Sequence, residues 1–397
     1  MPHQKTVASP ILPGATLGVM GGGQLGRMFI HAAQSMGYTT AVLDPDANSP
    51  AGLVSHHHVQ TDYLDADGLR ELAHLCQAVT TEFENVPAQS LMALSKSCPV
   101  APSAAAVAVA QDRRVEKARL AEIGKATGVV PVPYALIEKD MHVSLVDTIY
   151  LPGILKSATQ GYDGKGQVKV TTKAQLAIAW AQLGKVPCVL ELLVPLHEEF
   201  SVVLARGEDG NIVHFAPQRN VHINGILAAT YAHESDLKPS DVKELVDAAK
   251  AIANSLKYVG VLCVEFFLLQ DGSLVVNEIA PRPHNSGHYT LDACDVSQFE
   301  LQVRALCNLP LPQPRQHSPA IMLNLLGDLW FKTNPHTAQT PPWEKVLALP
   351  GTHLHLYGKA EAKLGRKMGH LTITGSSLEA VQSTTQQAAK ILGIDKY

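Results

Sequence analysis

The hydrophobic pattern at the start of the chain predicts a strand, a helix and a second strand. Residues 15–20 form a short apolar run, apolar side chains then recur at helical spacing as far as Gly37, and residues 38–43 form another apolar run. The intervening turn, residues 21–26, has the G-x-G-x-x-G spacing of dinucleotide-binding folds, and Asp44 follows at nearly their distance. Because glycine-led helix N-termini bind phosphates of many kinds, the pattern predicts an anion-binding α/β domain and leaves its ligand open.

Two further features belong to this first domain. His56–His58 is a histidine triplet, but consecutive side chains cannot readily converge on one metal ion, so we expect a surface loop. Residues 78–82 form another predicted strand, which runs into TTEFENVP. Strand ends in open α/β sheets point into the ligand crevice, which makes Glu82 a candidate for substrate contact.

A glycine-rich hairpin is predicted in the middle of the chain. Residues 153–156 end a strand, GYDGKGQ (161–167) follows, and alternation resumes near residue 168. Backbone N–H groups at such a tip can cover phosphate oxygens, although the motif lacks the spacing of a P-loop. Arg113 and Lys117 lie one turn apart on the preceding helix, either as a solvated face or as ligands.

The clearest chemical pattern lies in residues 261–290. Two apolar runs flank the turn sequence QDGS, which predicts a β-hairpin. If this hairpin is symmetric about Asp271-Gly272, Glu265 and Glu278 face each other, and directly opposed like charges destabilise a hairpin. A magnesium ion between them would remove the repulsion, whereas two acids facing solvent remain the alternative. Arg282, His284, Asn285 and His288 follow the pair, as suits an anion reacting beside a metal.

The remaining sequence predicts a covering helix and a smaller C-terminal unit. An amphipathic helix starts near residue 240, a proline-rich joint spans 309–314, and two later strands bracket GKAEAKLGRKMG, residues 358–369. The four cations in that segment form either solvated surface or a turn that closes on an anion. Ser376 and Glu379 have capping-box spacing for a last helix that ends at Gly393.

Composition limits the classes of protein that need consideration. The chain has 397 residues with 32 basic and 36 acidic side chains, which argues against general binding to nucleic acid or to membrane surfaces. It contains no uninterrupted apolar run of about 18 residues. Residues 1–14, with three prolines, are expected to form a flexible leader, and six cysteines without a CxxC pair are expected to be buried thiols in the cytoplasm.

Taken together, these motifs resemble the ATP-grasp ligases, and most closely the N5-carboxyaminoimidazole ribonucleotide synthetases. The matching stretches are GGGQLGRM, TTEFENVP, QDRRVEK, GYDGKGQ, VEFF, VNEIAPRPHNSGHYT, SQFE and GRKMGH. The resemblance implies an α/β fold. After the leader (1–14), its parts would be a Rossmann-like pre-ATP-grasp domain (15–112), an ATP-grasp domain (113–310) with a lid at roughly 125–195, and a small β-rich C-terminal domain (311–397).

The resemblance also implies an activity. It is the carboxylation of 5-aminoimidazole ribonucleotide with ATP and bicarbonate, through carboxyphosphate, in purine biosynthesis. ATP would be a co-substrate with magnesium, or manganese, as the metal. Family members are usually homodimers, and the product would pass to a separate mutase. No nucleic acid or membrane partner is expected.

Site residues are implied motif by motif. Residues expected to contact ATP are Arg113, Lys117, Lys156, Gly161, Tyr162, Asp163, Gly164, Lys165, Gly166, Gln167, Glu191, Leu192, Leu193, Val194, Glu199, His222, Phe267, Asn277 and Glu278. Glu265 and Glu278 would hold the metal, and Arg282, His284, Asn285 and Asp163 would be catalytic. The ribonucleotide would be bound by Gln24, Leu25, Glu82, Lys359 and Arg366, the last two at its 5′-phosphate. Asp163 and His284 are both open as the proton acceptor.

Three alternatives follow from the same residues. One is another ATP-grasp ligase, such as a formate-dependent glycinamide ribonucleotide transformylase or a biotin carboxylase. The second is a dinucleotide-dependent oxidoreductase built on Gly21, Gly23 and Gly26, which leaves the acidic hairpin unexplained. The third is a nucleotide sensor without catalytic activity, against which the complete set of charged residues argues.

Overall fold

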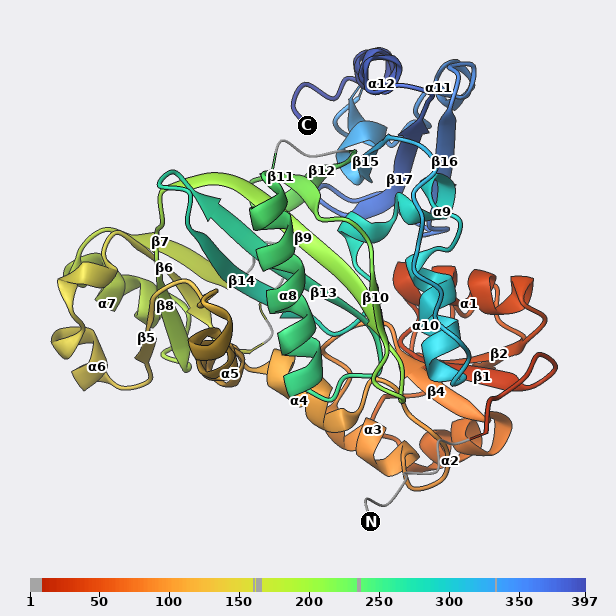
Figure 1. Cartoon of the computed structure of the whole chain (residues 1–397), viewed down its shortest axis with the longest axis horizontal. Coiled ribbons are helices and arrows are strands. Elements are labelled where there is room, and N and C mark those ends of the chain that lie inside the picture. Colours follow the sequence, from red (N-terminus) through yellow and green to blue (C-terminus); the bar gives the residue numbers. More distant parts are fainter. Residues whose placement is uncertain (1–8, 160, 162–165, 234–236, 333) are drawn as a thin grey trace.

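The first domain is built on a parallel sheet with helices packed around it (Figure 1), and strands β1, β2 and β4 are almost wholly buried. The computed structural model describes residues 9–159, 161, 166–233, 237–332 and 334–397. The strands lie in the order β3-β2-β1-β4; helix α1 connects β1 to β2 and helix α2 connects β3 to β4, whereas β2 reaches its parallel neighbour β3 through a loop. Their bounds are β1 Thr16–Met20, β2 Thr39–Leu43, β3 His57–Val59 and β4 Ala78–Thr81, with helices α1 Gln24–Ser35, α2 Ala66–Leu75, α3 Ala88–Leu94 and α4 Ala104–Gln111.

The predicted strand-helix-strand unit is confirmed, but the loop expected at the histidine triplet is wrong. His57 and His58 belong to strand β3, which pairs with β2. The ring of His56 contacts Thr40, with Nδ1 3.1 Å from Oγ1, and Nε2 of His58 lies 3.0 Å from the Asp44 carbonyl oxygen. These imidazoles are therefore engaged within the sheet.

The small sheet, antiparallel and also of four strands, lies at the position that the sequence gives to the lid (Figure 1, left). Helix α5 (Arg113–Thr127) leads into it and ends at Gly128, where φ is +85°. The strand order is β5-β8-β6-β7, and Leu155, Leu176 and Trp180 belong to its core. Its elements are β5 Tyr134–Ile137, α6 Asp140–Leu145, a 3-10 turn Thr148–Tyr150, β6 Gly153–Ser157, β7 Gln167–Val170, α7 Lys173–Gln182 and β8 Cys188–Leu192.

The third sheet extends across the predicted boundary between the central and C-terminal domains. Its order is β14-β13-β9-β11-β12-β15-β17-β16, with β10 beside β9. Antiparallel pairing of β12 with β15 makes the C-terminal strands a continuation of the ATP-grasp sheet. The bounds are β9 Leu196–Arg206, β10 Ile212–His214, β11 Gln218–Ile223, β12 Ile226–Ala232, β13 Gly260–Leu269, β14 Leu274–Ala280, β15 Ala320–Leu326, β16 Thr352–Leu356 and β17 Lys367–Thr374.

Helices cover this sheet and attach it to the first domain. Helix α8 (Pro239–Ser255) packs its apolar face over β9 and β13, as the periodicity predicts. Helix α10 (Gln298–Leu306) lies against α1, and Gln302 on it accepts from Val261 N and donates to Thr80 Oγ1. The remaining helical segments are Asn285–Gly287, α9 Thr290–Ala293, Gly327–Phe331, α11 Trp343–Leu347 and α12 Leu378–Leu392.

Several smaller expectations can be compared with the structure. Ser377, and not Ser376, caps α12, because its side chain accepts from Ala380 N, whereas the predicted end at Gly393 is confirmed. All six cysteines are free and buried, as expected. Ile11, in the predicted leader, donates its N–H to the Cys307 carbonyl oxygen at 2.9 Å. Among the described residues, no helix is long and apolar enough to span a bilayer.

Candidate active site

A cavity of about 790 Å³ is lined by residues of the first domain, the small sheet and the large sheet. Most of the motifs singled out in the sequence meet there. The predicted site residues that line it are Gln24, Leu25, Glu82, Arg113, Lys156, Gly161, Gln167, Glu199, His222, Glu265, Phe267, Asn277, Glu278, Arg282, His284 and Asn285. Segments more than 200 residues apart in the chain therefore build one site.

The acid hairpin forms with the predicted pairing, since Glu265 on β13 lies opposite Glu278 on β14. The predicted centre of the turn, between Asp271 and Gly272, is wrong, however. Leu268 pairs with Leu274, so the turn is centred on Asp271, with Gly272 at φ +84°. From the turn towards the two acids, the register shifts by one residue between Phe266 and Glu265. This shift leaves Asn277 unpaired and brings Glu265 opposite Glu278. Two offsets thus cancel.

Both acids have polar partners at the cavity wall. Oε1 of Glu265 lies 3.1 Å from Nε2 of His284, and Oε2 of Glu278 lies 3.4 Å from Nη1 of Arg113. Burial by itself would raise the pKa of Glu265, but the hydrogen bond and charge of His284, with the charge of His222, hold it well below its usual value. Glu265 is therefore ionised at neutral pH, as a metal ligand must be.

The donors at this hairpin fit a magnesium ion. Two carboxylates and an amide oxygen are the hard oxygen ligands that this ion prefers, and it completes its shell with phosphate and water. Within the described part of the chain, the buried Oδ1 of Asn277 has no hydrogen-bond partner. Asn277 is the unpaired residue next to Glu278 in the register, its Nδ2 lies 3.5 Å from Oε2 of Glu265, and it lines the same cavity. The unpartnered oxygen is thus available for coordination.

Arg282 is held by a residue that the sequence analysis did not select. Its Nε lies 2.5 Å from Oε2 of Glu84 and its Nη2 lies 3.3 Å from Oε1, which makes a two-pronged ion pair between the first domain and the loop after β14. Burial would raise the pKa of Glu84, but the charge of Arg282 lowers it to about 2. The guanidinium is therefore fixed in direction at the cavity.

Glu116 was also missed, although it belongs to the quoted motif QDRRVEK. Its buried carboxylate accepts from Ile279 N at 2.7 Å, beside the second acid of the hairpin. Burial and the nearby charge of Glu278 raise the pKa of Glu116 to about 7. Strand β14 is thereby tied to helix α5 by a carboxyl group that titrates near neutrality.

The glycine turn of the first domain is occupied by carboxylates of the protein. Glu82 accepts from Gly23 N at 2.7 Å and from Gly26 N at 2.9 Å, and Asp44 accepts from Gly22 N at 2.7 Å. A Cβ atom on Gly23 would lie 2.4 Å from Oε1 of Glu82, so a larger residue there would displace the carboxylate from this turn. The N–H groups that a dinucleotide phosphate would need are taken, which argues against the oxidoreductase.

Three family models match the chain. They describe a ribonucleotide synthetase preATP-grasp domain (residues 14–111), an ATP-grasp domain (123–299) and a phosphoribosylaminoimidazole carboxylase C-terminal domain (320–384). The N5-carboxyaminoimidazole ribonucleotide synthase of Brucella melitensis is 40% identical over 363 residues, which cover 91% of this chain and 96% of that protein. The synthase of Bacillus subtilis is 39% identical, covering 91% and 92%. The chain belongs to the N5-carboxyaminoimidazole ribonucleotide synthase family.

Solved structures of this family share the fold. A Staphylococcus aureus N5-carboxyaminoimidazole synthetase complexed with ADP matches with a TM-score of 0.86 and 36% identity, covering 97% of this chain and 99% of that one. The Aspergillus clavatus synthase in complex with ADP and 5-aminoimidazole ribonucleotide matches with a TM-score of 0.84 and 29% identity, covering 96% and 98%. The predicted fold and enzyme class are confirmed: the chain is an ATP-grasp ligase of the N5-carboxyaminoimidazole ribonucleotide synthase family, whose name implies a role in purine biosynthesis.

Some residues implied by the resemblance to this family lie behind the cavity wall. The side chain of Lys117 is only 1% exposed. Its Nζ lies 2.9 Å from Oε1 of Glu191 and donates a hydrogen bond of 2.7 Å to the carbonyl oxygen of Asn277. Lys156, which does line the cavity, lies 2.6 Å from the other oxygen of Glu191. Outside the set that lines this cavity are Lys117, Gly166, Glu191, Leu192, Leu193 and Val194, whose contact with ATP stays a prediction.

The predicted phosphate ligands of the ribonucleotide lie to one side of this synthase-family cavity. Lys359 lines a separate hollow with Trp330 and Met368, and Nη1 of Arg366 donates to the Glu361 carbonyl oxygen at 2.9 Å. Lys367 of the same cationic segment lines the main cavity instead. Tyr162, Asp163, Gly164 and Lys165 are outside the described residues. The roles of all these side chains stay predictions.

Other lining residues had a signal in the sequence that was not used. Phe83, Glu84 and Asn85 directly follow Glu82 in TTEFENVP, and Gln111 and Glu116 flank Arg113. His288 was noted in the loop after the acid hairpin but was not assigned a role. Each of these residues belongs to a motif that is typical of this synthase family. Whole motifs therefore predict the residues that line the cavity better than single charged residues do.

Proposed function

We propose that this cavity first activates bicarbonate with ATP and then carboxylates the exocyclic amine of 5-aminoimidazole ribonucleotide. The observation that carries the proposal is that the acid hairpin, with its free amide oxygen, and the Arg282–His284–Asn285 loop line the same cavity as Glu82. Metal ligands, anion-binding groups and a carboxylate that binds the glycine turn thus surround one volume. ATP, bicarbonate and ribonucleotide would meet there.

Residues of the small and large sheets would bind the nucleotide. Lys156 and Arg113 line the cavity and can neutralise phosphate oxygens, and Gly161 and Gln167 line it beside them. Glu265, Glu278 and Asn277 would hold magnesium, or manganese, which supplies neutralisation of the charge on the β- and γ-phosphates. Glu199, 2.5 Å from Nδ1 of His222, would complete the nucleotide site.

The first chemical step would form carboxyphosphate. A bicarbonate oxygen bonds to the γ-phosphorus as the bond to ADP breaks, and negative charge spreads over the phosphoryl oxygens. Arg282, oriented by Glu84, would hold the anion, and Asn285 can donate to it because its buried Nδ2 has no partner among the described residues. Enclosure matters because water would hydrolyse this mixed anhydride.

The second step would transfer the carboxyl group. The amine nitrogen bonds to the carboxyl carbon, phosphate leaves, and one amine proton passes to a base. Both ring nitrogens of His284 are engaged, Nε2 with Glu265 and Nδ1 with Ser286 at 2.8 Å, which favours Asp163 as the acceptor. Gln24, Leu25 and Glu82 would position the ring and ribose, and Lys359 and Arg366 the 5′-phosphate.

The cellular setting rests on the family resemblance. We expect a cytoplasmic homodimer whose labile carbamate product passes to a separate mutase. Gel filtration with light scattering would test the dimer directly.

Phosphate release from ATP, with each substrate omitted in turn, tests the proposed reaction. Release should require both aminoimidazole ribonucleotide and bicarbonate, and neither formate nor biotin should replace bicarbonate. Equal release without bicarbonate, or with formate in its place, would overturn the proposal.

A further inference from the structure

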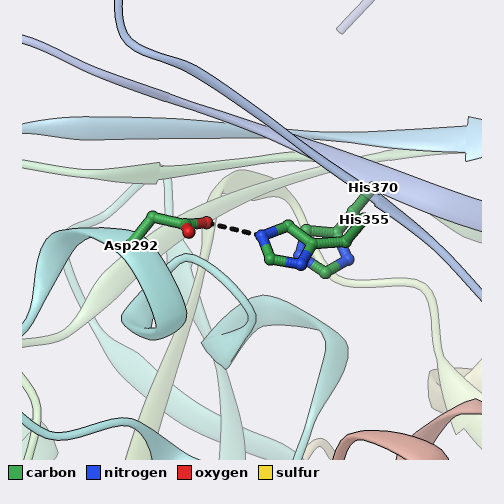
Figure 2. Close-up of side chains that lie close together, drawn as sticks. All are labelled: Asp292, His355 and His370. Carbon is green, nitrogen blue, oxygen red and sulfur yellow. Dashed lines mark hydrogen bonds and ion pairs between the residues drawn. The ribbon is translucent and has the colours of Figure 1, made fainter.

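A second cluster of ligand-type side chains lies away from the cavity, where the C-terminal strands meet α9. His355 on β16 is directly opposite His370 on β17 in the antiparallel register. Such partners have Cβ atoms about 5 Å apart and share one face of the sheet. Figure 2 shows the two imidazoles stacked, with ring centroids 4.5 Å apart, and the carboxylate of Asp292 directed at His355, its Oδ2 2.9 Å from Nε2.

These three side chains form a ligand set of a familiar chemical type. Each offers one ligand atom, and those atoms lie within 4.8 Å of one another. Two imidazoles and one carboxylate suit zinc and related first-row dications, whereas the oxygen-only set on the acid hairpin suits magnesium. The two sites would therefore select different ions.

An unpartnered nitrogen gives a second, independent reason to expect a ligand. Within the described part of the chain, Nε2 of the fully buried His370 has no hydrogen-bond partner. Nδ1 of the same ring lies 3.0 Å from the Tyr357 hydroxyl, so a ring that donates Nδ1–H to this oxygen leaves a lone pair on Nε2.

We propose that Asp292, His355 and His370 bind a zinc-type dication. Binding would replace the hydrogen bond between Asp292 and His355: the proton of the neutral His355 ring moves from Nε2 to Nδ1, and the ion bonds to the freed Nε2, to the carboxylate and to Nε2 of His370. Bonds of about 2.0–2.2 Å place the ligand atoms of one ion roughly 3.5 Å apart, so small side-chain rotations must close the set. His355 is 31% exposed, which gives the ion and a water ligand access.

A metal ion at this site would connect the C-terminal strands to the loop that lines the active-site cavity. Helix α9, which carries Asp292, begins directly after the loop with His284, Asn285 and His288. The ring of His288 also packs against His370, with centroids 4.8 Å apart. An ion at this point would fasten the cavity loop to strands β16 and β17, so zinc should raise the melting temperature of the folded chain.

Zinc titration of the metal-free full chain, in excess magnesium and in competition with a chromogenic chelator, tests the site. Asp292→Asn and His355→Gln keep the size of the side chain and lie at its accessible edge. Each should weaken zinc binding by about 100-fold or more and abolish the zinc-dependent rise in melting temperature, because losing a direct ligand exceeds the effect of losing an outer partner. Melting curves without zinc establish that both variants are folded.

His57→Gln is the matched control, because it alters the histidine triplet, which is the obvious site for adventitious zinc. This variant should bind zinc as the unmodified chain does. Absence of zinc binding by the unmodified chain, equal affinity in Asp292→Asn and His355→Gln, or loss of binding in His57→Gln would each overturn the proposal.

Discussion

Replacing Glu84 by Gln removes the charge that holds Arg282 at the cavity. Folding lowers the pKa of Glu84 from its usual 4.5 to about 2. This drop of about 2.5, at about 1.4 kcal/mol for each pH unit, corresponds to about 3 kcal/mol of stability. The side chains of Glu84 and Arg282 are only 25% and 17% exposed, so solvent screens the pair little. Glu84→Gln should therefore destabilise the protein by about 3 kcal/mol at neutral pH.

The effect has a defined pH dependence. Because the folded-state pKa is the lower one, the stabilisation is complete above pH 4.5 and is lost as the pH falls towards 2. Denaturant unfolding of the unmodified chain and of Glu84→Gln, followed across this window, should show the two curves converging. In the phosphate-release assay, the KM for bicarbonate should rise more than the KM for ATP, because Arg282 loses its anchor.

Glu122→Gln is the matched control, since it makes the same substitution in an exposed ion pair. The side chain of Glu122 is 68% exposed and that of its partner Arg119 is 41% exposed. Exposed pairs of this kind contribute about 0.5 kcal/mol. If Glu84→Gln were no more destabilising than Glu122→Gln, or if its bicarbonate KM were unchanged, the role given to this ion pair would be refuted.

Two further predictions concern other groups at the cavity. Folding raises the pKa of Glu116 from its usual 4.5 to about 7, so the unmodified chain should lose about 3 kcal/mol of stability relative to Glu116→Gln as the pH rises through this range. Denaturant unfolding of both proteins at pH 5 and at pH 8 measures this loss. A difference in stability that is the same at both pH values would contradict the prediction. Lys359→Ala should raise the KM for the ribonucleotide more than that for ATP, as steady-state kinetics would reveal, with Lys345→Ala as an exposed control; an unchanged ribonucleotide KM would remove Lys359 from the phosphate site.

Much of the fold follows from local patterns in the sequence. Strand alternation, glycine turns and the amphipathic stripe of α8 are properties of short segments, and these elements form where they are predicted. Errors arose where the deciding contact is a single residue. The irregularity at Asn277 and the cap at Ser377 depend on one backbone position, which periodicity does not resolve.

Roles that depend on distant partners could not be predicted. Glu84 contacts Arg282 across 198 positions in the chain, and Glu116 contacts Ile279 across 163. Likewise, the pairing of β12 with β15, which extends one sheet into the C-terminal domain, leaves no local mark in either strand. A motif indicates that a carboxylate lies near the site, but only the fold gives its partner and therefore its charge.

The central claim is that the two acids facing each other across β13 and β14 hold the metal that ATP turnover needs. Magnesium-dependent release of ADP, with ribonucleotide and bicarbonate present, tests it most directly in the unmodified chain, in Glu278→Gln and in the Glu122→Gln control. We expect Glu278→Gln to abolish release at any magnesium concentration, while the control releases ADP like the unmodified chain. Release by Glu278→Gln at the unmodified rate and with the same dependence on magnesium would contradict the claim.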